Sequence, residues 1–275
     1  MPLYSRLNNK VINFNYSSSN EVNKEFKIHY HNIFEVYYFI EGDVDYLVEG
    51  KQYHPTPYSL LLLSPNVFHG VRINSDKNYQ RYVLHFHPEI INIDYRHLLL
   101  SAFPNTQKYS NREVYYENTS QFKLHPFFEA LSDCSKQPEE IAFKLFPIYI
   151  EALLSQLTIM CRTLQPVETG RTISNTMSNI ITYLNENLSE RITLDGLSEH
   201  FFISKNYLNR AFREATGTTV FDYLIYKRVI YAQQLLLNGY PASEASLRSG
   251  FSDYSSFYRA YQKITGHSPH KDMRN

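Results

Sequence analysis

Three histidines and one glutamate in the N-terminal part of the chain carry the groups best able to do chemistry. His29, His31 and Glu35 follow the spacing His-x-His-x-x-x-Glu, and His69 follows the turn that begins at Pro65. Imidazole and carboxylate groups in this combination suit Fe, Mn, Ni or Zn. They equally suit hydrogen bonding to a small organic molecule in a pocket. A third interpretation is that they are core residues satisfied by their neighbours.

The elements that must position these groups are short strands. Residues 26–88 are rich in Val, Ile, Tyr and Phe and are broken by turn signals at 41–43, 49–51, 55–57 and 64–66. This pattern predicts a small antiparallel barrel or jelly roll. If one strand runs on from His29, positions 29, 31, 35 and 37 face the same side, which adds Tyr37 to the set. His85 and His87 share a face of a later strand, 82–87. They either belong to the pocket or lie outside it, and we favour the second alternative.

Helical periods begin after Pro126. Apolar residues at steps of three and four predict a long helix over 139–163, with Pro147 as its candidate break point, preceded by a shorter helix at 125–135. The polar segment 165–172 contains Pro and Gly and is typical of a linker. We therefore expect an α+β chain of two domains, 1–164 and 173–275. The apolar stripe of the long helix either packs on the barrel or pairs with its copy in a second subunit.

An internal repeat marks the C-terminal part. Arg210-Ala-Phe-x-x-x-Thr-Gly recurs 49 residues later as Arg259-Ala-Tyr-x-x-x-Thr-Gly. Each copy follows a short amphipathic segment and a turn, which predicts an all-helical domain with two helix-turn-helix units, at about 193–216 and 242–265. A connecting helix over 221–238 would span about 27 Å. That length suits two recognition helices in successive major grooves, about 34 Å apart.

Exposed residues of the two second helices are the candidate DNA-reading groups. Because Leu208, Phe212, Phe257 and Tyr261 must face the core, their neighbours are left to contact bases. Arg suits guanine and Asn suits adenine in the major groove, whereas other cations fix register on phosphates. The base-contact candidates are Asn206, Asn209, Arg210, Tyr254, Ser255, Tyr258 and Arg259, and the phosphate candidates are Lys205, Arg213 and Lys263. For any one of them the alternative is a solvated helix face.

Composition limits the other possibilities. The 275 residues carry 27 basic and 27 acidic side chains, so bulk charge contributes little to DNA affinity. Two cysteines are too few for a disulfide framework. No apolar run approaches 18 residues, and the first residues do not resemble a secretory signal. We therefore expect a cytoplasmic protein with no membrane partner.

The C-terminal hundred residues resemble the AraC/XylS family of bacterial transcription regulators. The resemblance rests on Ile203-Ser204-x-x-Tyr207-Leu208-x-Arg210-x-Phe212, Arg228-Val229-x-x-Ala232 and Gly250-Phe251-Ser252-Asp253-x-Ser255-x-Phe257-x-Arg259-x-Tyr261, with Gly266-x-Ser268-Pro269. It implies a homodimer that binds double-stranded DNA, contacts RNA polymerase and usually activates transcription. It also implies an N-terminal barrel that binds an effector, often a sugar, and usually no metal.

The spacing His29-x-His31-x-x-x-Glu35, with Gly42 following, also matches the first motif of cupin barrels. We therefore expect an effector site made of His29, His31, Glu35, Tyr37 and His69. We expect no catalytic role and no cofactor, although His29, His31, Glu35 and His69 are the residues that would bind a divalent transition metal. The alternatives are a metal-dependent cupin enzyme or metal sensor joined to a DNA-binding module, and a constitutive dimeric regulator without effector.

Overall fold

The computed structural model describes residues 5–8, 11–23, 25–104, 114–166, 171–172 and 175–273. The chain forms two compact units, Met1–Arg171 and Thr172–Asn275. The division falls within the segment predicted as a linker, of which residues 167–170 lie outside the described part. The expected α+β fold is confirmed, because the first unit combines β-strands with α-helices and the second is helical.

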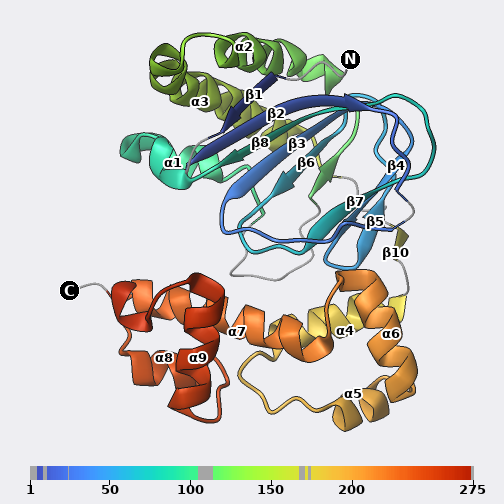
Figure 1. Ribbon diagram of the computed structural model, residues 1–275, viewed down its shortest axis with the longest axis vertical. Helices are drawn as coiled ribbons and strands as arrows, with labels where there is room; N and C mark the ends of the chain where they lie inside the picture. Colours follow the sequence, from blue (N-terminus) through green and yellow to red (C-terminus); the bar gives the residue numbers. More distant parts are fainter. Residues whose placement is uncertain are drawn as a thin grey trace. The chain divides into compact units, whose positions relative to one another are not determined.

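Two sheets form the first unit (Figure 1). The larger has the order β1 (Ser5–Asn8), β2 (Ile12–Ser19), β8 (Tyr79–Phe86), β3 (Phe34–Glu41), β6 (Leu60–Leu63) and β9 (Tyr115–Tyr116). The smaller has the order β10 (Arg171–Thr172), β5 (Lys51–Tyr53), β4 (Val44–Val48) and β7 (His69–Ile73). Pairings among β1 to β9 are antiparallel, as predicted for residues 26–88. Strands β1 and β2 precede that predicted region and were not expected.

Helices cover the outer face of the larger sheet (Figure 1). They are α1 (Ile93–Leu100), α2 (His125–Ser135) and α3 (Glu139–Thr163), with short 3₁₀ turns η1 (Pro88–Ile90) and η2 (Thr119–Phe122) between them. The bounds predicted for α2 and α3 are confirmed, whereas α1 was not predicted. The suggested break at Pro147 is wrong: α3 continues through it. The lost backbone donor is outweighed by the burial of Phe146 and Ile150 on the core.

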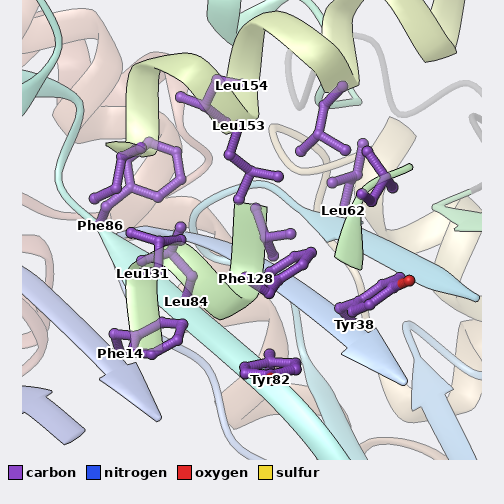
Figure 2. Packing of buried hydrophobic residues seen from close by; sticks show 14 of the residues in the cluster. Phe14, Tyr38, Leu62, Tyr82, Leu84, Phe86, Phe128, Leu131, Leu153 and Leu154 are labelled. Carbon is purple, nitrogen blue, oxygen red and sulfur yellow. The ribbon is translucent and has the colours of Figure 1, made fainter. Parts of the chain in front are cut away.

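Alternation along β3 builds the core on both faces of the larger sheet. Val36 and Tyr38 face the helices, where the Tyr38 ring stacks on Phe128 with centroids 4.5 Å apart, and Figure 2 shows this layer. Tyr37 and Phe39 face the smaller sheet and belong to a second buried cluster between the sheets. Each fully buried apolar side chain contributes about 1.5–3 kcal/mol. Because both faces of β3 are covered, Glu35 also lies inside the protein.

The second unit is helical, as predicted. Its helices are α4 (Asn175–Glu186), α5 (Leu194–His200), α6 (Lys205–Thr216), α7 (Val220–Leu237), α8 (Ala242–Arg248) and α9 (Tyr254–Thr265), followed by η3 (Pro269–Lys271). Ser204 and Asp253 cap α6 and α9 by accepting hydrogen bonds from backbone amides in the first turn. Both helices end at a glycine in the left-handed conformation, Gly217 and Gly266.

Gly250, in the turn between α8 and α9, is fixed by contacts across this unit. Its φ is +87°, and a Cβ there would collide with the carbonyl oxygen of Leu188. The same carbonyl accepts a hydrogen bond from Arg228 Nε of α7 at 2.7 Å. The turn of the second helix-turn-helix unit is thereby held against the connecting helix α7 and the loop after α4.

Candidate functional site

The histidine cluster lies between the two sheets, and both sheets supply its members. Glu35 is on β3, and His85 is its directly paired neighbour on β8. His69 begins β7 of the smaller sheet, and Tyr46 is on β4. The predicted continuous strand from position 29 is wrong, because β3 begins at Phe34. His29 is instead held by an antiparallel bridge to His69, with N–O distances of 2.8 and 3.0 Å.

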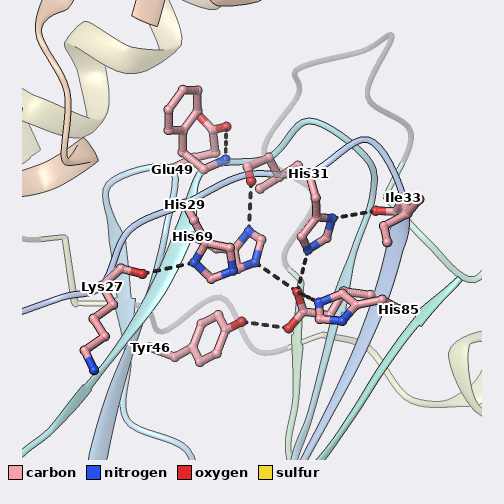
Figure 3. Close-up of polar contacts among 11 residues, drawn as sticks. Lys27, His29, His31, Ile33, Tyr46, Glu49, His69 and His85 are labelled. Atoms are coloured by element: carbon pink, nitrogen blue, oxygen red, sulfur yellow. Dashed lines mark hydrogen bonds and ion pairs between the residues drawn. The ribbon is translucent and has the colours of Figure 1, made fainter. Parts of the chain in front are cut away.

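The Glu35 carboxylate is the centre of the cluster (Figure 3). Its Oε2 lies 2.9 Å from His31 Nε2, 2.9 Å from His69 Nε2 and 3.1 Å from His85 Nε2. Its Oε1 accepts a hydrogen bond from the Tyr46 hydroxyl at 3.0 Å. Glu35 is 2% exposed. A carboxylate so deeply buried is stable only because these donors surround it.

Three of the imidazole rings are also held through their Nδ1 atom, which lies within hydrogen-bond distance of a backbone carbonyl oxygen. His29 Nδ1 lies 3.0 Å from the Lys27 oxygen. His31 Nδ1 lies 2.9 Å from the Ile33 oxygen, and His69 Nδ1 lies 2.8 Å from the Val67 oxygen. A carbonyl oxygen can only accept, so each Nδ1 carries the hydrogen and donates it. In a neutral ring the Nε2 atom then has a free lone pair.

Burial and charge pull the pKa values in this cluster in opposite directions. Burial would raise the pKa of Glu35, but the charge of His69 and the hydrogen bonds from its neighbours outweigh it and hold that pKa well below its usual range. Burial lowers the pKa of His69, yet the attraction of Glu35 leaves it raised overall. The pKa of His29 is lowered by burial and by repulsion from His69. The carboxylate is therefore ionised at neutral pH.

Of the five residues expected at the effector site, the structure brings four together. The potential ligand atoms of His29, His31, Glu35 and His69 lie within 4.8 Å of one another. Tyr37 shares their side of β3, but its hydroxyl is hydrogen-bonded to Tyr79 at 2.9 Å, deeper between the sheets.

Sequence reasoning missed two members of the cluster. His85 was expected outside the pocket, and this is wrong, because the register of β8 against β3 places it opposite Glu35. Tyr46 was not considered, and only the approach of the two sheets reveals its bond to Glu35. His87 is as expected: it lies beyond the end of β8, 3.5 Å from Glu89.

The candidate DNA-reading residues lie on α6 and α9. Asn206, Asn209 and Arg210 are exposed on α6, on the face opposite the buried Leu208 and Phe212. On α9, Tyr254, Ser255 and Arg259 are exposed and Tyr258 is half-buried. The phosphate candidates Lys205, Arg213 and Lys263 are also exposed. Lys205 is paired with Asp195 of α5, and Arg259 donates a long hydrogen bond to Ser256 at 3.4 Å.

Comparison with known proteins defines the class. A helix-turn-helix domain model matches residues 197–275, and an AraC-like ligand binding domain model matches residues 12–114. The two matches place an AraC-like ligand binding domain before a helix-turn-helix domain in one chain. This is the domain arrangement expected from the resemblance to AraC-type transcription regulators.

Individual relatives match to different extents. The transcriptional regulatory protein HptR of Staphylococcus aureus is 29% identical over 93 residues, which are 34% of this chain and 37% of HptR. The chain therefore spans about a third of the length of that relative. An uncharacterized HTH-type regulator of Bacillus subtilis, YbfI, is 23% identical over 84% of this chain and 81% of its own length. The DNA-binding domain of AdpA, solved in complex with a target DNA, is 27% identical over 36% of this chain and 89% of that domain, with a TM-score of 0.35.

The cluster predicts unequal roles for two buried tyrosines. Tyr46→Phe removes a hydrogen bond to a charged carboxylate and should lower the free energy of unfolding by about 1.5–3 kcal/mol. Tyr37→Phe removes a bond between two neutral hydroxyls in the same interior and should cost about 1 kcal/mol. Urea unfolding of both variants measures the difference. A cost for Tyr37→Phe equal to or above that for Tyr46→Phe would contradict the central role given to Glu35.

Proposed function

We propose that this regulator is a cytoplasmic transcription activator controlled by a small polar effector that binds the N-terminal domain at the histidine cluster. The observation that carries this proposal is a set of convergent polar groups inside a domain that matches a ligand-binding model. The cluster is accessible at one edge, because His29 is exposed and the His31 side chain is 18% exposed. The proposed role is binding and not catalysis. Carbohydrates, whose hydroxyls pair with imidazole and carboxylate groups, are the effector class to test first.

We further propose that α6 and α9 are the two recognition helices. Their caps, glycine ends and buried faces are equivalent, so each presents its exposed face in the same way. Arg210 and Arg259 occupy the same position of the repeat and suit bidentate contact with guanine. RNA polymerase is the expected partner of the DNA-bound activator.

A DNA-binding assay separates the proposed base contact from the proposed phosphate contacts. Arg210→Ala should weaken binding to the preferred sequence by about 1–3 kcal/mol and relax selectivity at one base pair. Arg213→Ala, on the same exposed helix, should weaken binding to all sequences and reduce the salt-dependence slope by about 1. The preferred duplex is selected from a random pool with the full-length protein. Unchanged sequence preference in Arg210→Ala would show that α6 does not read bases through this residue.

Thermal unfolding of the full-length protein tests the effector site. A ligand present at a hundredfold excess over its dissociation constant stabilises the folded state by about 2.7 kcal/mol. From a panel of sugars and small acids, we expect one class to raise the melting temperature of the wild type and not of His31→Ala. His54→Ala is the matched control, because His54 pairs with Asp45 away from the cluster and its side chain is 63% exposed. If the ligand raises the melting temperature of His31→Ala as it does that of the wild type, the effector binds elsewhere. If no compound raises the melting temperature of the wild type, a constitutive regulator is favoured.

The outer face of α3 supports a homodimer. Its buried face packs in the core, including Phe146, Ile150 and Leu157. The opposite face exposes Ile141, Leu145, Ile148, Ala152, Ser155 and Ile159, at alternating steps of four and three. That spacing is the seam of a two-helix coiled coil. Within the described residues α3 is also the one helix long and apolar enough to cross a membrane, but its core face makes pairing with a second copy the better account of the exposed one.

Sedimentation of seam variants tests the dimer. Ile148 is 61% exposed, so Ile148→Glu should leave the fold intact while placing a charge in the centre of the seam. We expect dimer dissociation to become easier by at least about tenfold, with an unchanged melting profile of the monomer. Val22→Glu makes the same change at another exposed apolar residue and should have no effect. Equal association of the wild type and Ile148→Glu would exclude α3 as the interface.

A further inference from the structure

We infer that His29, His31, Glu35 and His69 bind one divalent transition-metal ion. Their potential ligand atoms lie within 4.8 Å of one another. They come from the loop before β3, from β3 itself and from the start of β7, so the folded domain brings them together from both sheets. The inference concerns the residues of the proposed effector site, but it does not depend on any regulation of DNA binding.

The orientation of the rings is the first argument. His29, His31 and His69 each direct Nδ1 to a backbone carbonyl two residues away in sequence. Histidines that bind metals commonly donate their other ring N–H in this way, which fixes the tautomer and points the Nε2 lone pair at the ion. Three neighbouring rings are oriented by the same kind of backbone hydrogen bond. This indicates that their three Nε2 lone pairs bind one common ion.

The Nε2 atom of His69 is the second, independent argument. The His69 side chain is 1% exposed, and its Nε2 atom lies 2.9 Å from Glu35 Oε2 as an ion pair without the alignment of a hydrogen bond. Two ligand atoms that each lie about 2.0–2.2 Å from one metal ion approach each other to a similar distance.

His85 and Tyr46 fit as residues that orient the carboxylate. Tyr46 donates to Oε1 and His85 approaches Oε2 from the paired strand. Carboxylate ligands are commonly held by such hydrogen bonds, and loss of one weakens metal binding about 10–100-fold. These two contacts orient the carboxylate so that its Oε2 atom lies toward the ligand atoms of His29, His31 and His69.

The ligand set limits the choice of metal. Three imidazoles and one carboxylate suit Zn²⁺, Fe²⁺, Mn²⁺, Ni²⁺ or Co²⁺ better than Ca²⁺ or Mg²⁺, which prefer oxygen ligands. Four protein ligands complete a tetrahedral zinc site. An ion that prefers six ligands would keep two positions for oxygen atoms from water or from an effector.

Metal titration of the full-length protein, without DNA or effector, tests this inference. The protein is stripped with a chelator, dialysed and titrated with Zn²⁺ in a calorimeter and with Co²⁺ in a spectrophotometer. We expect one equivalent per chain and the visible ligand-field absorption of protein-bound Co²⁺. His31→Ala and Glu35→Gln should each weaken Zn²⁺ binding by more than about 100-fold, and Tyr46→Phe should weaken it about tenfold.

His54→Ala should bind Zn²⁺ as the wild type does, because His54 lies outside the cluster. Failure of the wild type to bind one equivalent overturns the inference, as does binding that survives unchanged in both His31→Ala and Glu35→Gln. Thermal unfolding of each variant separates loss of ligands from loss of fold, and the wild-type stoichiometry needs no variant. Because no DNA is present, failure to bind metal would leave the proposed DNA-binding role unaffected. Failure to bind DNA would likewise leave the proposed metal site unaffected.

Discussion

The ionised, buried carboxylate of Glu35 is the constraint on which the N-terminal domain depends. The free energy needed to bury an isolated charge in that position would exceed the stability of a domain, so hydrogen-bond donors and opposite charges must surround it. They come from everywhere around it: His85 from β8, Tyr46 from β4, His69 from β7 and His31 from the loop before β3. The two sheets are consequently joined at this end by polar contacts, while Tyr37 and Phe39 join them by apolar packing further along β3. Whatever binds at the carboxylate acts on both sheets.

The helical second unit is stabilised in a different way. Its two helix-turn-helix units are held by apolar cores and by local signals at the helix ends, and not by buried charge. Ser204 and Asp253 start α6 and α9, and Gly217 and Gly266 end them. Gly250 and Arg228 tie the turn between α8 and α9 to α7 through the Leu188 carbonyl. The chain's balanced total charge leaves affinity to a few well-placed cations and to the use of two recognition helices. Dimerisation through α3 would double the number of such helices from two to four.

Much of this could be predicted from the sequence, and what could not has physical reasons. Helix α3 was predicted because it has an apolar stripe at steps of three and four, and α6 and α9 because caps and glycines mark their ends. Helix α1 buries only Leu99 and so leaves no stripe to recognise, and the second half of β2 is a run of serines with no alternation. His29, His31 and Glu35 were predicted together, though for a reason that was partly wrong, since His29 is placed by its bridge to His69. His85 and Tyr46 depend on strand register and on the approach of two sheets, neither of which leaves a local signal.

The central claim is that occupancy of the Glu35 cluster is linked to DNA binding. The most direct measurement is the dissociation constant of the full-length protein for its selected duplex, with and without a saturating concentration of the compound that raises its melting temperature, at one salt concentration. Linkage predicts a change of about 5–150-fold, corresponding to a coupling free energy of about 1–3 kcal/mol, and predicts that Glu35→Gln removes the difference. Equal affinities of the wild-type protein with and without that compound would contradict the account.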